Sequence, residues 1–198
     1  MKKLLILLFL SVAQLAIAEN AKTILDKASA RFREAGNVKI GFQLTTGGNT
    51  TTGYINVAEK KFFCDMDGFC VWFDGTTMWH YVKANEEVNI STPSARNLER
   101  MNPYFFLSMY KNGYTCKMGK STKDYYEVIM KGNSKTAFSS VTVRLSRKDY
   151  SPLYTKTVTK KTTMEITVNS FLPGQKFEAS SFRFNPKEFP QVEVIDLR

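Results

Sequence analysis

Side chains that commonly carry out covalent chemistry are scarce in this sequence of 198 residues. Its single histidine, His80, lies between Trp79 and Tyr81, with no carboxylate or cysteine at the spacing of a metal site or a catalytic triad. Glycine-rich phosphate loops and the HExxH and Cys-x-x-Cys motifs are absent. Asp65 and Asp67 form a carboxylate pair, but a tight turn needs such residues for its own backbone hydrogen bonds. We therefore expect a protein that is not an enzyme, without catalytic residues, metal or cofactor.

Three cysteines are the remaining candidates for chemistry. Cys64 and Cys70 flank a predicted hairpin tip, and a three-residue loop at 66–68 would place them opposite each other, so that they could form a disulfide. A two-residue turn would instead pair Cys70 with Asp65 and keep the two cysteines apart. Both alternatives remain open from the sequence. Cys116 has no partner in either alternative and is expected to be a small buried hydrophobe.

The N-terminus has the pattern of a secretory signal peptide. Lys2 and Lys3 form a basic region, residues 4–10 are continuously apolar, and Ala16 and Ala18 are the small residues that signal peptidase requires. The apolar run is shorter than the roughly 20 residues that span a bilayer. We expect residues 1–18 to be removed after Ala18, leaving residues 19–198 as a single domain outside the cytoplasm.

The charge balance is basic, with 28 Lys and Arg against 18 Asp and Glu and a formal net charge of +10. These basic residues are spread along the chain, and no nucleic-acid recognition motif accompanies them. A solvated basic face explains the charge, so we expect no nucleic-acid partner.

The pattern of apolar residues predicts a mostly β protein. Residues 20–35 have helical spacing, with Asn20 as the N-cap and Gly36 as the stop. Alternating apolar residues at 38–44 predict a half-buried strand, and short strands separated by tight turns follow as an antiparallel meander. A short apolar helix is expected at 102–110 between the two series of strands. The predicted strands occupy residues 38–44, 54–57, 62–66, 69–73, 78–82, 88–91, 114–118, 125–130, 137–145, 153–158, 162–171 and 192–197.

Aromatic residues are unusually frequent, with 15 Phe, 9 Tyr and 2 Trp. They are concentrated between the first predicted strand and the predicted central helix. An ordinary packed core explains such a concentration, and so does a curved sheet whose apolar face encloses a ligand. Composition alone does not separate these two explanations.

Three segments in order along the chain resemble a known family. The stretch FDGTTMWHY at 73–81 is similar to a "DGKTLWFY" hairpin, NPYFFL at 102–107 to an "NTPFMLI" helix start, and ASSFRFNP at 179–186 to a closing "AAKFTFTPP". These motifs resemble those of the periplasmic outer-membrane lipoprotein carrier (LolA-like) proteins, and the ending EVIDLR resembles Bacteroides-type relatives. The better-known carriers have an Arg-Pro before the third strand that tethers a lid, whereas this chain has AEKKF at 58–62.

The resemblance implies an α+β fold in which an unclosed antiparallel β-barrel, or curved sheet, is covered by short helices. It also implies a soluble periplasmic carrier that binds the acyl chains of lipoproteins in a hydrophobic cavity and shuttles them from the inner to the outer membrane. By analogy the partners are acylated lipoproteins, an inner-membrane ABC transporter and an outer-membrane acceptor, with transient membrane contact and a monomeric carrier. The residues expected to line the acyl-chain cavity are Phe42, Phe62, Trp72, Trp79, Phe105, Phe106 and Met109.

The alternative is a periplasmic binding module for a small apolar ligand or a free lipid that does not shuttle lipoproteins. A further alternative is an interaction protein whose aromatic residues are simply its core. Only the carrier should retain acylated proteins, and only the interaction protein should lack a cavity.

Overall fold

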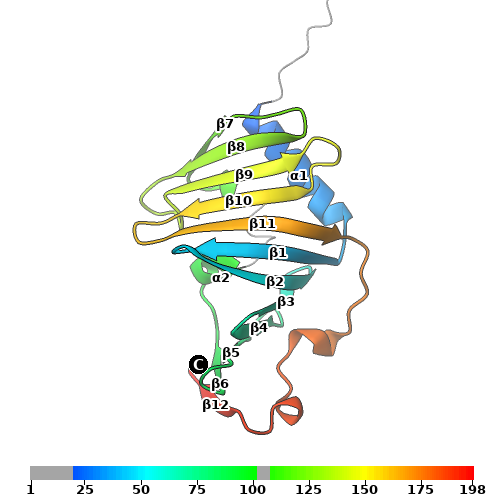
Figure 1. The fold of residues 1–198 in the computed structure, drawn as a ribbon, viewed down its shortest axis with the longest axis vertical. Helices are drawn as coiled ribbons and strands as arrows, with labels where there is room; N and C mark the ends of the chain where they lie inside the picture. The colour runs from blue at the N-terminus through cyan, green and yellow to red at the C-terminus, as the bar shows by residue number, and fades with distance from the viewer. Residues whose placement is uncertain (1–19, 102–107) are drawn as a thin grey trace, which may run out of the picture.

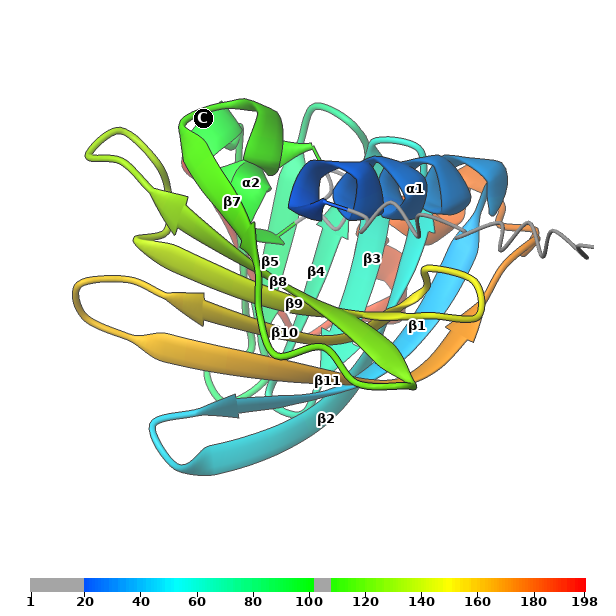
Figure 2. The same cartoon turned by 90° about the horizontal axis from the view of Figure 1, so that it is seen from above.

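A computed structural model describes residues 20–101 and 108–198, which form one curved sheet with a long helix on one face (Figures 1 and 2). The helices are α1 (Ala21–Glu34) and α2 (Ala95–Met101), with short 3-10 helices η1 (Met109–Lys111), η2 (Ala179–Phe182) and η3 (Pro186–Glu188). The strands are β1 (Val38–Thr46), β2 (Asn49–Ala58), β3 (Lys61–Met66), β4 (Phe69–Phe73), β5 (Met78–Val82), β6 (Glu87–Ser91), β7 (Tyr114–Met118), β8 (Tyr125–Gly132), β9 (Ser140–Ser146), β10 (Pro152–Val158), β11 (Thr163–Leu172) and β12 (Glu193–Asp196).

The described strands form one twelve-stranded sheet in the order β12-β6-β5-β4-β3-β2-β1-β11-β10-β9-β8-β7. Two antiparallel meanders, β2 to β6 and β7 to β11, meet at β1, which pairs with β2 on one side and β11 on the other. Only β12 runs parallel to its neighbour, β6. Neither edge strand pairs with the other, so the sheet is not closed, and the predicted fold class is confirmed.

The sheet bends where β1 meets β11. The register shifts between Gly41 and Phe42, which is the signature of a bulge, and bulges increase local bend and twist. Ser170 Oγ lies 2.6 Å from the position that a Cβ on Gly41 would occupy. A side chain at position 41 would therefore displace the Ser170 hydroxyl group, which accepts a hydrogen bond from Gly41 N (3.2 Å) at this bulge.

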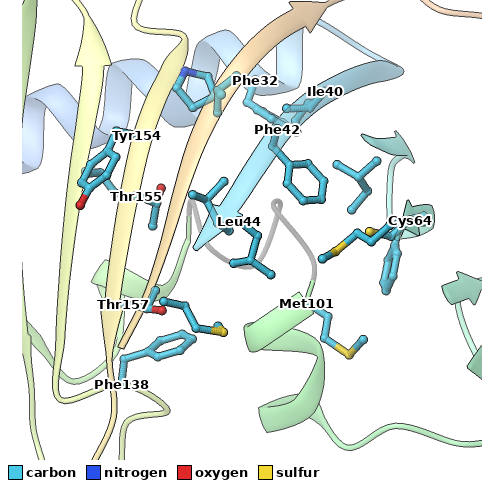
Figure 3. A pocket seen from close by; sticks show the side chains of 18 of the residues that line it. Phe32, Ile40, Phe42, Leu44, Cys64, Met101, Phe138, Tyr154, Thr155 and Thr157 are labelled. Carbon is cyan, nitrogen blue, oxygen red and sulfur yellow. The ribbon is translucent and has the colours of Figure 1, made fainter. Parts of the chain in front are cut away.

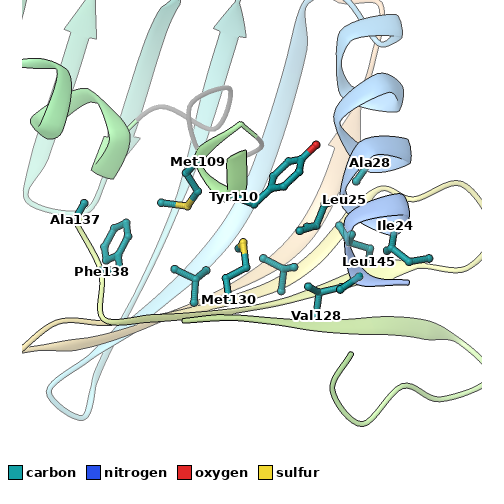
Figure 4. Close-up of a cluster of buried hydrophobic side chains, with 13 residues drawn as sticks. Ile24, Leu25, Ala28, Met109, Tyr110, Val128, Met130, Ala137, Phe138 and Leu145 are labelled. Carbon is teal, nitrogen blue, oxygen red and sulfur yellow. The ribbon is translucent and has the colours of Figure 1, made fainter. Parts of the chain in front are cut away.

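Helix α1 begins as the sequence predicts, because the Asn20 side chain accepts a hydrogen bond from Thr23 N (2.9 Å). Gly36 follows the helix with φ +64°, a conformation that favours glycine. The apolar side of α1 lies on the concave face of the sheet (Figure 2). There Ile24 and Leu25 join a cluster with Val128 and other residues of β8 and β9 (Figure 4).

The central helical region differs from the prediction. Helix α2 occupies Ala95–Met101, a segment too polar to show apolar periodicity, and η1 lies at Met109–Lys111. The helix expected at 102–110 falls largely on residues 102–107, which lie outside the described residues. Within the described part, η1 is buried through Met109 and Tyr110, and Tyr110 Oη donates a short hydrogen bond to the Asp26 carboxylate of α1.

Candidate functional site

The concave face of the sheet encloses an apolar cavity of about 280 Å³ (Figure 3). It lies under α1 and α2 and is walled by strands from both meanders, with β1 in the middle. This volume is close to the lower end of the roughly 300–1,000 Å³ typical of ligand pockets. The lining residues are Leu25, Phe32, Ile40, Phe42, Leu44, Ile55, Phe62, Cys64, Met66, Phe69, Val71, Met101, Met130, Phe138, Val143, Leu145, Pro152, Tyr154, Thr155, Thr157, Met164, Ile166 and Val168.

The part of the cavity wall formed by the described residues contains no charged side chain, and 19 of these 23 residues are aliphatic, phenylalanine, methionine or proline. The exceptions are Cys64, Tyr154, Thr155 and Thr157. Tyr154 Oη donates a hydrogen bond to Glu165 Oε2 (2.7 Å), so its polar group already has a partner. Burial, with the neighbouring Cys70 and Asp65, raises the pKa of the Cys64 thiol to about 12, which keeps the thiol neutral at physiological pH. The wall therefore offers dispersion and apolar contact rather than acid–base or nucleophilic groups.

The alternation along the strands decides which residues reach the cavity. Ile40, Phe42 and Leu44 point to the concave face from β1, and Phe62, Cys64 and Met66 do so from β3, in keeping with the two-residue period of a strand. Two of the expected lining residues, Phe42 and Phe62, thus lie in the wall. Both are buried, with 8% and 1% of their surface exposed.

Trp72 and Trp79 lie on the opposite face of the sheet and do not line the cavity. They face each other across β4 and β5, while their neighbours Phe73 and Met78 belong to the concave side. The C-terminal segment, residues 177–198, covers them. Its Phe184 ring lies 5.6 Å from Trp72, centroid to centroid. The expectation that these two tryptophans line the cavity is therefore wrong in its choice of face.

The remaining expected residues are elsewhere. Met109 is 3% exposed and belongs to the cluster between α1, β8 and β9 (Figure 4), beside the cavity rather than in its wall. Phe105 and Phe106 lie outside the described residues.

Several wall residues were missed from the sequence. Met164, Ile166 and Val168 on β11 alternate with polar residues, and this two-residue period would have identified them as one face of a strand. What the sequence does not show is that β11 pairs with β1 and therefore shares its concave face. Met101 at the end of α2 is another missed residue, and 37% of its surface is exposed.

The cysteines follow the two-residue alternative for the hairpin tip. Met66 pairs with Phe69 and Asp65 pairs with Cys70, so Cys64 and Cys70 point to opposite faces and form no disulfide. Cys70 Sγ instead donates to Asp65 Oδ1 (3.2 Å). Cys116 is also free.

No group of three potential metal ligands occurs within residues 20–101 and 108–198. His80 is exposed on β5, and its ring lies edge-on to Phe69 at 5.6 Å. In the same part of the chain, no helix is both long and apolar enough to cross a membrane.

The described residues thus form an open curved sheet around an apolar cavity whose lining suits an apolar ligand. The comparison with family models gives the family. The model described as "Outer membrane lipoprotein carrier protein LolA" matches residues 10–162, which is more than half of the chain. The chain belongs to this family, whose members are carriers and not enzymes. No curated protein sequence matches the chain.

Solved structures are similar to this chain at low sequence identity, and the first described below shares its fold. An uncharacterized conserved protein from Thermus thermophilus is 12% identical with a TM-score of 0.63, over 89% of this chain and 98% of that one. A LolA superfamily protein from Nitrosomonas europaea is 10% identical with a TM-score of 0.47, over 84% and 99% of the two chains. A putative outer membrane lipoprotein-sorting protein domain from Vibrio parahaemolyticus is 14% identical with a TM-score of 0.48, over 83% and 97%.

Proposed function

We propose that this protein is a periplasmic carrier that binds the acyl chains of lipoproteins in the concave cavity and shuttles them from the inner to the outer membrane. The observation that carries the proposal is the cavity wall, whose 23 lining residues in the described part of the chain include no charged side chain. Residues 1–18 are proposed as the signal peptide, cleaved after Ala18, and residues 19–198 as the carrier domain.

The physical need for such a carrier follows from the cost of exposing acyl chains to water. Each methylene group kept out of water is worth about 0.8 kcal/mol, so a long acyl chain exposed in the periplasm would aggregate or return to its membrane. A wall of Phe, Leu, Ile, Val and Met side chains supports binding without fixed polar geometry. Met66, Met101, Met130 and Met164 add adaptability, because a flexible thioether side chain fits acyl chains of different shape.

The partners are proposed by analogy with the family. A monomeric carrier of this kind would receive acylated lipoproteins from an inner-membrane ABC transporter and pass them to an outer-membrane acceptor, touching each membrane only transiently. An uncharged wall favours ready release as well as binding, because no ion pair has to be broken when the ligand leaves.

Native mass spectrometry of the protein purified from periplasm, followed by lipid extraction, tests the proposal. We expect a co-purified acylated protein, and in vitro binding of a dipalmitoylated cysteine lipopeptide but not of the same peptide without acyl chains. Free lipid without acylated protein, and no binding of the lipopeptide, would favour a lipid-binding module instead. An empty protein that takes up neither lipid nor lipopeptide would overturn the carrier function.

A further inference from the structure

A second, polar pocket adjoins the apolar cavity at one end of the sheet. It has a volume of about 620 Å³ and lies between the β8–β9 connection and the β10–β11 turn. Phe138, Thr157 and Met164 line both spaces, so the polar pocket continues from the wall of the cavity. Figure 3 shows Phe138 and Thr157 together at this end of the cavity, with Met101 across from them. The other lining residues of the polar pocket are Asn133, Ser134, Thr136, Ala137, Ser139, Thr159, Lys160, Lys161 and Thr162.

The polar pocket has a positive charge that no acid offsets. Among the described residues that line it, Lys160 and Lys161 are the only charged ones, and both are exposed. Neither lysine forms an ion pair with any residue in the described ranges 20–101 and 108–198. Two ammonium groups beside an apolar cavity favour an anion attached to an apolar body.

The turn that carries the two lysines is well ordered by its own hydrogen bonds. Thr159 Oγ1 accepts from Lys161 N (3.2 Å) and from Thr162 N (3.0 Å), and Thr159 N donates to Thr162 O (2.9 Å). On the facing side, Ser139 Oγ donates to Val158 O (2.9 Å) and ties the β8–β9 connection to β10. The pocket is thus formed before a ligand arrives, which reduces the entropy lost on binding.

Thr157 marks the boundary between the apolar and polar spaces. Only 6% of its surface is exposed, and it lines both the apolar cavity and the polar pocket. Its hydroxyl group is a hydrogen-bond donor placed where the apolar space ends and the polar space begins. An ester carbonyl at the junction of an acyl chain and its head group is an acceptor of the right chemistry at this place.

We propose that the polar pocket is the head-group subsite for the acyl ligand of the cavity. It would take an acyl ester that carries an anionic group, phosphate or carboxylate, with the ester carbonyl at Thr157 and the anion at Lys160 and Lys161. This inference rests on the proposed function, because it assumes that the cavity holds the acyl chain.

Binding of two single-chain lipids tests the subsite. Palmitoyl lysophosphatidylglycerol and palmitoyl lysophosphatidylcholine have the same acyl ester, but only the first has a net negative charge. We expect the wild type to bind the anionic lipid more tightly than the zwitterionic one. The double variant Lys160→Gln/Lys161→Gln should have about tenfold lower affinity for the anionic lipid and unchanged affinity for the zwitterionic lipid. The matched control is Lys60→Gln/Lys61→Gln, at the β2–β3 turn at the opposite end of the strands, which should change neither affinity.

Thr157→Val tests the ester contact separately. Replacing the hydroxyl by a methyl group of similar size should lower the affinity for both lipids about three- to tenfold, which is the contribution of one hydrogen bond. Melting temperatures of all variants check that each is folded. A second pair of ligands distinguishes the sources of the anion, namely a dipalmitoylated cysteine lipopeptide continued by two aspartates or by two lysines. A preference for the aspartate peptide alone would assign the subsite to lipoprotein cargo, and a preference for the phospholipid alone would assign it to membrane lipid.

The outcomes separate the two proposals. If both lysophospholipids bind equally well, and neither the lysine variant nor Thr157→Val changes this, the head-group subsite is wrong while the apolar cavity stands. If no acyl ligand of either pair binds to the folded wild type, the proposed function itself fails.

Discussion

A carboxylate placed in the cavity wall should prevent binding of an acyl chain in a manner that depends on pH. Leu44 on β1 lines the cavity, whereas its neighbour Gln43 is exposed on the other face of the same strand. In Leu44→Asp, the new carboxylate is hydrated as long as the cavity is empty. An acyl chain would remove that water, so the aspartate would have to bind a proton before the ligand could be accommodated.

The cost of that proton sets the size of the effect. An aspartate has an ordinary pKa of about 3.9, so protonation at pH 7 costs about 4.2 kcal/mol, which corresponds to about a 1,000-fold loss of affinity. At pH 5 the same step costs about 1.5 kcal/mol, or about tenfold. The affinity of Leu44→Asp should therefore recover about a hundredfold between pH 7 and pH 5.

The assay is titration with palmitoyl lysophosphatidylcholine, whose net charge stays constant over this pH range. Leu44→Asn controls for lost apolar contact and should show a smaller loss that does not vary with pH. Gln43→Asp places the same charge one residue away on the exposed face and should bind like the wild type. Unchanged binding by a folded Leu44→Asp, or equal losses at pH 5 and pH 7, would refute the assignment of the cavity as the acyl-chain site.

Three further outcomes are expected. In a variant with the other two cysteines replaced by serine, labelling of Cys64 by a neutral maleimide should be slow, and bound lysophospholipid should make it slower still. Mass spectrometry follows the labelling, and equal rates with and without lysophospholipid would place the ligand elsewhere. Burial raises the pKa of Asp74, but hydrogen bonds from the backbone of the following turn and from Arg183 (2.9 Å) lower it more, so its net pKa lies below the ordinary value. The stabilisation is present above about pH 4 and lost as the pH falls through the lowered pKa, so Asp74→Asn should reduce the free energy of unfolding at pH 7 and approach the wild type in acid, measured by urea titration. Tyr110→Phe should lower that free energy by about 1–3 kcal/mol through loss of the hydrogen bond to Asp26, and an unchanged urea midpoint would contradict this role.

Local features of the fold were predictable because neighbouring residues determine them. Asn20 caps α1, and the alternation through Phe42 identifies one buried face of β1. The prediction placed Trp72 on the wrong face because β4 is apolar on both faces, with Phe73 in the concave cluster. In such a strand the sequence has no apolar–polar alternation, so it does not show which face is concave. The partner that covers Trp72 is Phe184, more than a hundred positions later, and no local pattern shows such a contact.

The pairing of β1 with β11 determines when the apolar cavity can first be enclosed. Lys39 lies opposite Leu172, so β1 can pair with β11 only after a further 133 residues have been synthesised. Contacts so distant in sequence form slowly, because a long loop must close before they contribute. During synthesis, β1 to β6 are made before β8 to β11, so the part of the cavity wall that β8 to β11 form is still missing. A cavity with both walls therefore exists only after β11 has been made and has paired with β1.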